Sequence, residues 1–302
     1  MDIKVKKRNG NFEPLAWEKV TKVLDWAAEG LDVSVSQVEL NAKVQLYNGI
    51  LTSDIHDMII KSAADLISTE TPDYQYMSAR LAIFHLRKIA FSQFEPPHLF
   101  DHVKKLTQAG KYDAHILADY SHAEFDELNA AIVHDRDLTF SYAAVKQLEG
   151  KYLVQNHATR QVNESPQFLY MLVSMCLFAK YPQNTRLDYV KRFYDAISEF
   201  KISLPTPIMA GVRTPSRQFS SCVLIESDDS LDGIAAASTA IIKYVSQRAG
   251  IGINAGAIRA LGSEIRGGEA VHTGLIPFFK MFQAATKSCS QGAIRSGSAT
   301  LF

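Results

Sequence analysis

Cysteine is scarce in this chain, which contains three in 302 residues: Cys176, Cys222 and Cys289. They lie far apart in the sequence and do not form a disulfide framework, so we expect a reducing, cytoplasmic location. The sequence also lacks C-x-x-C and H-E-x-x-H motifs. We therefore expect no metal site built by this chain alone.

An excess of charge of one sign is also absent, because 32 Lys and Arg balance 32 Asp and Glu. This balance gives no global basic signal for nucleic acid. The longest apolar run, residues 168–179, is too short for a membrane helix, which needs about 20 residues. The charged start, "MDIKVKKRNG", lacks the apolar stretch of a secretory signal. Neither nucleic acid nor a membrane is an expected partner.

The length and the 47% hydrophobic fraction are typical of a soluble globular protein with two or three domains. Three segments differ in their residue patterns, which predicts three domains over residues 1–91, 92–200 and 201–302. The first segment predicts a hairpin and a helical bundle, and the second predicts mostly helices. Short apolar runs alternate with helical patterns in the third, as in α/β units.

The first segment opens with a basic hairpin that turns at Asn9-Gly10, a dipeptide favoured in tight turns. Five cations of the hairpin and the following helix could hold phosphates: Lys4, Lys6, Lys7, Arg8 and Lys19. The alternative is a solvated charged edge that discourages aggregation between strands. The residues alone leave both interpretations open.

Helical spacing predicts a first helix over residues 17–28, which Gly30 ends. Thr52 and Ser53 are candidate caps of a second helix. Pro72 is expected at the first position of a third helix. After a linker with two prolines, the second segment predicts helices over residues 165–181 and 185–200.

In the third segment, the run "CVLIE" predicts a buried strand that begins at Cys222. Helices are expected over residues 231–249 and 274–289, a glycine-rich strand or loop over 250–256, and another strand in "GSATLF". Alternation of this kind predicts a parallel sheet. So few α/β units cannot close a barrel or cover a sheet edge, so the third segment is expected to be incomplete.

Two glycine-rich stretches, residues 248–270 and 290–298, contain Arg259, Arg266 and Arg295. Arginine binds phosphate oxygens through paired hydrogen bonds, but ordinary flexible loops explain the same composition. The cysteines are similarly open to two readings. Cys222 could be a small buried hydrophobic residue or a functional thiol, Cys176 is expected in the core, and Cys289 is ambiguous.

Several long motifs together resemble the large, catalytic subunit of class Ia ribonucleoside-diphosphate reductase, of bacterial and phage type, in its N-terminal part only. The resemblance covers essentially the whole chain. The motifs are "KRNGNFEPLAWEKVTKVLDWAAEGL", "TSDIHDMIIKSAADLIS", "PDYQYMSARLAIFHLRK", "HDRDLTFSYAAVKQLEGKYL", "FKISLPTPIMAGVRTP", "RQFSSCVLIE", "YVSQRAGIGINAG" and "IRALGSEIRGGEAVHTG". It implies an ATP-cone (β-hairpin plus helical bundle), an all-α domain and the first part of a ten-stranded α/β barrel.

The resemblance implies that ATP switches the enzyme on, and dATP switches it off, at an activity site in the ATP-cone. The matching positions are Val5, Lys7, Arg8, Glu13, Lys19, Thr52, His56 and Lys88. Lysines and an arginine would neutralise a triphosphate, and a helix start offers N–H groups. Ala16 departs from the family, which often has a polar residue there.

In the barrel segment, the resemblance implies that the substrate diphosphate and ribose are lined by Thr206, Ser221, Ala249 and Gly250. A specificity site, where a deoxynucleoside triphosphate or ATP selects the base to be reduced, would comprise Asp229, Ser230, Leu231, Arg259 and Arg266. Gln291 and Arg295 would face the substrate base from a loop that "IRSGS" makes stiffer than usual. The specificity site lies at a dimer interface in this family, so a homodimer is implied.

Cys222 matches one of two cysteines that deliver reducing equivalents after a thiyl radical abstracts the 3′ hydrogen of the ribose. Motifs for the radical cysteine, the second redox cysteine and the radical-transfer tyrosines do not occur in the sequence. We therefore expect no activity from this chain alone. Implied partners are a second chain that completes the barrel, a small subunit with the metal-radical cofactor, thioredoxin or glutaredoxin, and a nucleoside diphosphate.

Two origins remain open: a split gene or an excised fragment. A split gene is preferred because the cut falls inside the barrel rather than at a domain boundary. A different class of function is a non-catalytic ATP/dATP-sensing regulatory module, which would leave Cys222 without a purpose. An anaerobic glycyl-radical reductase also carries an ATP-cone, but it does not need this redox cysteine pair.

Overall fold

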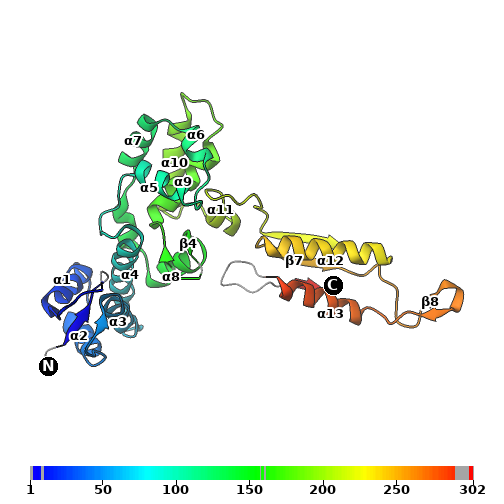
Figure 1. Cartoon of the computed structure of the whole chain (residues 1–302), viewed down its shortest axis with the longest axis horizontal. Coiled ribbons are helices and arrows are strands. Elements are labelled where there is room, and N and C mark those ends of the chain that lie inside the picture. Colours follow the sequence, from blue (N-terminus) through cyan, green and yellow to red (C-terminus); the bar gives the residue numbers. More distant parts are fainter. Residues whose placement is uncertain (1–2, 8–9, 157, 160, 290–298, 302) are drawn as a thin grey trace. The chain divides into compact units, whose positions relative to one another are not determined.

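The computed structural model describes residues 3–7, 10–156, 158–159, 161–289 and 299–301. Arg8, Gln291 and Arg295, three of the predicted site residues, lie outside these ranges. The chain forms two compact units (Figure 1). The first comprises Met1–Ser203 with Arg213–Pro215, and the second comprises Leu204–Val212 with Ser216–Phe302. The division into three domains at residues 91/92 and 200/201 remains a prediction.

The first unit begins with the predicted hairpin, in which β1 (Lys4–Lys6) pairs antiparallel with β2 (Phe12–Pro14). Gly10 adopts a φ of 89°, which an L side chain rarely adopts, and the Lys7 N–H donates to the Asn11 carbonyl at 2.8 Å. The short β3 (Ile50–Leu51) lies parallel to β1 on its other side. Val5 is therefore buried in the centre of a small three-stranded sheet.

Four helices of this part of the chain pack against one another: α1 (Trp17–Ala28), α2 (Val35–Lys43), α3 (Thr52–Ala64) and α4 (Tyr74–Phe91). The prediction of α1 is confirmed, whereas α2 was not predicted. The predicted caps of α3 are wrong, because Leu51 is the N-cap, Thr52 is the first helical residue, and the Ser53 hydroxyl donates to Asp54. Pro72 lies before α4, whose N-cap is Asp73, so the third helix begins later than predicted.

The rest of the first unit is mostly helical, as predicted. Its elements are α5 (Leu99–Gln108), α6 (His115–Asp119), α7 (His122–Ala130), the 3₁₀ helix η1 (His134–Thr139), α8 (Tyr142–Lys151), β4 (Gln155–Asn156), β5 (Gln161–Val162), α9 (Pro166–Phe178) and α10 (Arg186–Ser198). Residues 166–175 of α9 are all buried, so this helix forms the centre of the unit. Cys176 is only half-buried, which corrects the expectation that it lies in the core.

The second unit contains the predicted α/β pattern. Its elements are α11 (Thr206–Gly211), β6 (Cys222–Glu226), α12 (Leu231–Ser246), β7 (Gly250–Asn254), β8 (Glu264–Ile265), the 3₁₀ helix η2 (Arg266–Gly268), β9 (Ala270–Val271), α13 (Ile276–Ser288) and β10 (Ala299–Leu301). Strands β6, β7 and β10 form a parallel sheet in the order β10-β7-β6. The parallel sheet predicted from the sequence is thus confirmed.

One face of this sheet packs against α12 and α13, which lie side by side in Figure 1. Val223 and Ile225 of β6 point to that face and contact the core around Ile251 and Ile253. Leu224 points the other way and is 78% exposed, and Cys222 is also exposed. The strand is therefore only partly buried, and on one face alone, which corrects the prediction of a buried strand. The described strands form an open sheet, as expected for part of a barrel.

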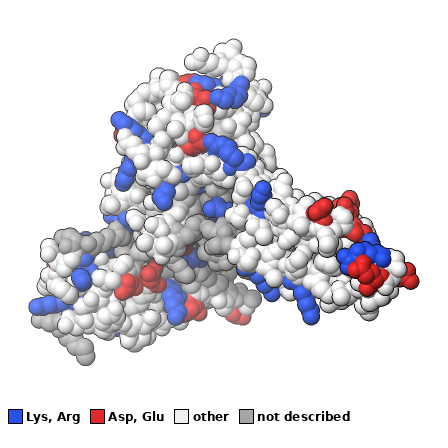
Figure 2. All heavy atoms as spheres, turned by 45° about the vertical axis from the view of Figure 1, so that its right-hand side comes forward, with Lys and Arg blue, Asp and Glu red and all other residues white. Residues whose placement is uncertain are grey.

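Within the described residues, no helix is both long enough and apolar enough to span a membrane. On the face drawn in Figure 2, basic and acidic side chains are scattered among uncharged ones.

Candidate functional site

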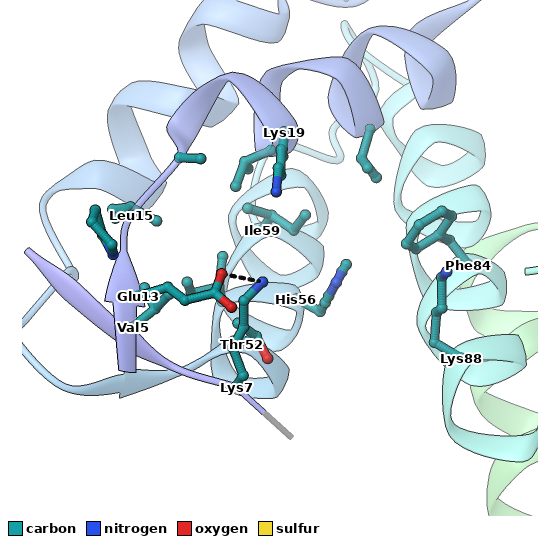
Figure 3. Close-up of a pocket in the computed structure, with 15 residues that line it drawn as sticks. Val5, Lys7, Glu13, Leu15, Lys19, Thr52, His56, Ile59, Phe84 and Lys88 are labelled. Atoms are coloured by element: carbon teal, nitrogen blue, oxygen red, sulfur yellow. Dashed lines mark ion pairs between the residues drawn. The ribbon is translucent and has the colours of Figure 1, made fainter. Parts of the chain in front are cut away.

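A cavity of about 360 Å³ opens between the β1–β2 hairpin and helices α1, α3 and α4 (Figure 3). Every predicted activity-site residue that the structure describes lines it: Val5, Lys7, Glu13, Lys19, Thr52, His56 and Lys88. These residues come from five elements and, for Lys7, from the turn that follows β1, and they are up to 83 positions apart in the sequence, from Val5 to Lys88. The fold therefore gathers them at one cavity.

The charged groups of this cavity favour an anion. Its lining contains three lysines and one carboxylate, that of Glu13, which lies 3.3 Å from the Lys7 ammonium. In Figure 3, Lys19 projects from α1 toward the space between the hairpin and α4, and Lys88 lies on the far side. Positive charge gathered around an open cavity attracts phosphate groups.

The start of α3 adds a second source of positive potential. Thr52 is the first residue of this helix and lines the cavity, and the N-cap residue Leu51 provides no side-chain acceptor. The first N–H groups of a helix have no partner within the helix and carry the positive end of its dipole. A helix start beside lysines suits a phosphate chain.

The remainder of the lining is apolar and suits a nucleobase. Ile59 lies one helical turn after His56, and Phe84 lies one turn before Lys88, so each follows from helix geometry once its neighbour is known. The His56 and Phe84 ring centroids are 5.5 Å apart, and Trp26 packs behind Phe84 at 5.8 Å. The sequence interpretation missed Ile59 and Phe84. Ala16 also lines the cavity and offers only a methyl group.

In the second unit, Cys222 begins β6 and is the register partner of Gly250 in β7. The Gly250 N–H donates to the Ser221 carbonyl at 2.8 Å, and a Cβ on Gly250 would lie 3.5 Å from the Cys222 sulfur. The thiol therefore lies beside bare backbone, where a ligand can approach it. The fold thus brings Ser221, Cys222 and Gly250 together, next to the buried Ala249.

Thr206 is the first residue of α11 and is half-buried. In the parts of the chain that the structure describes, no hydrogen bond joins it to Ser221 or Cys222. The thiol lies where the parallel strands begin, whereas ligands of α/β sheets usually bind where the strands end. The position of Cys222 therefore could not be inferred from general rules for such sheets.

Four of the five predicted specificity-site residues, Asp229, Ser230, Leu231 and Arg259, lie around the start of α12. The Asp229 carboxylate accepts the backbone N–H of Arg259 at 2.8 Å and its Nε–H at 2.6 Å. Both bonds lower the pKa of Asp229 below its ordinary value, and the bond from the backbone N–H has the larger effect. Ser230 is the N-cap of α12, and Leu231, its first residue, is 80% exposed.

Arg266 lies apart from this cluster in its contacts, because its Nε pairs with Glu269 at 2.9 Å. One residue that the sequence interpretation missed is Asp228. Its Oδ1 accepts the Ser230 hydroxyl at 2.7 Å and the Ser230 N–H at 2.9 Å, which together lower the pKa of Asp228. Across the described ranges, no group of three or more His, Cys, Asp or Glu side chains could hold a metal ion.

Comparison with known families divides the sequence into three matches. Residues 3–89 match the ATP cone domain, residues 138–217 match the all-alpha domain of ribonucleotide reductase, and residues 220–302 match its barrel domain. The order is the one that the resemblance implied. The ATP-cone match indicates a site for a nucleotide effector in the first unit.

Curated relatives match nearly the whole chain. Ribonucleoside-diphosphate reductase 1 subunit alpha of Salmonella typhimurium is 70% identical over 299 residues, which is 99% of this chain and 39% of the relative. The Escherichia coli protein of that name is 69% identical with the same coverage, and the subunit alpha of Enterobacteria phage T4 is 51% identical over 99% of this chain and 40% of its own length. The chain thus spans about two fifths of the length of these relatives. Its sequence, its three domain matches and their order identify the chain as a member of the ribonucleotide reductase family, related to the alpha subunit.

Proposed function

We propose that this chain contributes the activity site, most of the specificity site and one redox-active cysteine to the reduction of ribonucleoside diphosphates to deoxyribonucleotides. The observation that carries the proposal is the cavity of the first unit, where lysines, a helix start and an apolar wall converge.

In this proposal, ATP and dATP compete for that cavity. Lys7, Lys19 and Lys88 neutralise the triphosphate, and the N–H groups at the start of α3 bind its oxygens. The base lies against the apolar wall, where Phe84 offers an aromatic ring. ATP activates the enzyme, and dATP inhibits it.

Cys222 supplies one of the two thiols that reduce the substrate. Two thiols together give two electrons and two protons: one hydrogen joins C2′, the other leaves with the 2′ hydroxyl as water, and a disulfide forms between the sulfurs. The exposed thiol beside Gly250 supports this role, because a ribose could approach it there. The second cysteine belongs to the remainder of the alpha-subunit barrel, so this chain alone is inactive.

The partners follow from the family. They are a chain that provides the rest of the barrel, a small subunit with the metal-radical cofactor, a second copy of the large subunit, and thioredoxin or glutaredoxin as the reductant, in the cytoplasm. A non-catalytic ATP/dATP sensor is the other candidate. The cavity alone would serve such a sensor, but the exposed Cys222 would then have no role.

Isothermal titration calorimetry of the 302-residue chain with ATP and with dATP tests the effector site. We expect both nucleotides to bind and Lys19→Ala to weaken each about tenfold, since a charge-assisted hydrogen bond contributes about 1.5–3 kcal/mol. Lys22, an exposed lysine of the same helix outside the cavity, provides the matched control in Lys22→Ala. If neither nucleotide binds, or both variants weaken binding equally, the activity site is not where we propose.

A further inference from the structure

We propose that Asp228 restrains effector binding at the specificity site by holding the two hydrogen-bond donors of Ser230. The inference rests on the proposed function, which assigns Ser230 to that site. Asp228 itself is not among the residues that the family resemblance assigned. In this scheme an effector must displace the Asp228 carboxylate before it can use Ser230.

The donors of Ser230 are fully used in the structure. Its backbone N–H donates to Asp228 Oδ1 at 2.9 Å, and its hydroxyl donates to the same oxygen at 2.7 Å. The hydroxyl oxygen also accepts the Gly233 N–H at 3.0 Å, as an N-cap does. Since a serine hydroxyl has a single proton, Ser230 has none left to donate to an incoming phosphate or ribose.

Gly233 makes this arrangement possible. A Cβ built on Gly233 would overlap the Asp228 carboxylate, chiefly at the Oδ1 atom that accepts from Ser230. Any other residue at position 233 therefore requires the carboxylate to move. Glycine has a low helix propensity, yet Gly233 lies in the first turn of α12. Its missing side chain leaves the space that the Asp228 carboxylate occupies.

Charge works in the same direction as the hydrogen bonds. The hydrogen bond from the Ser230 hydroxyl lowers the pKa of Asp228 most, and the bond from the Ser230 N–H lowers it further. The carboxylate is therefore ionised at neutral pH. It lies at the start of α12, where the helix dipole favours an anion. A nucleotide phosphate is attracted to the same groups and is repelled by the carboxylate that already binds them.

A purely structural role for Asp228 predicts a different outcome. As a stabiliser of the α12 start, it would keep Ser230 in place for the effector, and its removal would weaken binding. As a competitor, its removal releases the Ser230 donors and strengthens binding. The sign of the change in effector affinity therefore separates the two roles.

The experiment titrates the full chain with dTTP, a nucleotide other than the two proposed for the activity site. We expect Asp228→Ala and Gly233→Ala each to bind dTTP about three- to tenfold more tightly than wild type. The first variant removes the carboxylate, and the second displaces it while keeping its charge. Asp232→Ala removes an equal charge from the first turn of α12 and should change the affinity by less than about twofold.

Unchanged or weaker dTTP binding in both Asp228→Ala and Gly233→Ala would overturn the proposal, as would an equal gain in Asp232→Ala. Amide exchange at Ser230 gives a readout independent of the ligand and should be faster in Asp228→Ala. Arg259→Ala distinguishes a failure of the Asp228 restraint from a failure of the proposed specificity site. If it abolishes dTTP binding while the Asp228 variant is unaffected, only the restraint is wrong; if dTTP binds Arg259→Ala as it binds wild type, the specificity site itself is elsewhere.

Discussion

Asp229 and Arg259 are joined by two hydrogen bonds across 30 residues of sequence, one to the backbone N–H and one to Nε–H. The pair ties the loop before α12 to the loop after β7. It fixes the direction of the Arg259 guanidinium, whose NH1 also donates to the Glu264 carbonyl at 3.3 Å. An arginine held in this way has less side-chain entropy to lose when it binds a phosphate.

We expect Arg259→Lys to weaken dTTP binding about tenfold or more, because lysine has no Nε–H fork with which to bind Asp229 and a phosphate together. Calorimetry of the full chain measures the change. Arg266→Lys is the comparison, since Arg266 pairs with the exposed Glu269 rather than with Asp229. Equal losses in the two variants would mean that the Asp229 bonds do not position the guanidinium.

Stability of the first unit should depend on a buried ion pair. Arg213 and Glu164 are both fully buried, and Glu164 also accepts the Tyr112 hydroxyl at 2.5 Å. Arg213→Met leaves the carboxylate buried without its cation, so we expect a loss of about 3–5 kcal/mol in the free energy of unfolding. Urea denaturation followed by circular dichroism measures it. Arg192→Met, which breaks an exposed pair with Asp188, should lose about 0.5 kcal/mol or less.

Acid should destabilise the first unit through two buried histidines. Burial lowers the pKa of His102 and that of His134 to about 4. The unfolded chain, with a histidine pKa of about 6.5, then binds more protons than the folded chain between these values. Each histidine therefore contributes stability that is complete above pH 6.5 and is lost as the pH falls toward 4.

His102 is the better test of this pH dependence, because its side chain is buried whereas that of His134 is only half-buried. Its Nε2 also has no hydrogen-bond partner among the described residues. We expect His102→Leu to flatten the fall in unfolding free energy between pH 6.5 and 4.5, measured by urea denaturation at several pH values. A slope as steep as that of the wild type would show that His102 is protonated in the folded chain.

The Cys222 thiol should be the most reactive of the three cysteines toward iodoacetamide, because it is exposed while Cys176 and Cys289 are half-buried. Gly250→Val should slow its alkylation, since a Cβ at this position lies 3.5 Å from the sulfur and further methyl groups would cover it. Mass spectrometry of labelled peptides gives both rates, with Cys289 as an internal reference. Equal rates at all three thiols would contradict the exposed position of Cys222.

The sequence predicted helices and strands where apolar side chains recur at regular spacing or form a short run. The spacing of Leu24 and Ala27 predicted α1, and the apolar run at Cys222 predicted β6. Helix α2 was missed because its sequence, "VSQVELNAK", is largely polar and buries only Val38 and Ala42. The start of α3 was misassigned, because the serine and threonine expected as caps lie inside the helix.

Some residues of the candidate sites could be predicted from the sequence, and others could be found only from the fold. The resemblance supplied Lys19 and His56, and the fold adds that Phe84 faces them from α4. The role of Asp228 could not be predicted from the sequence. It depends on the space that the missing Cβ of Gly233 leaves for the Asp228 carboxylate in the folded chain. The buried Arg213 gave no signal either, since arginine is usually exposed and its partner Glu164 is 49 residues away.

The most direct test of the account is multiple-turnover reduction of a nucleoside diphosphate by a reconstituted complex of this chain, the rest of the alpha subunit, the small subunit and a dithiol reductant. We expect Cys222→Ser to abolish multiple turnover while Cys289→Ser retains it. Undiminished turnover in Cys222→Ser would contradict the redox role and leave this chain as an effector-binding module.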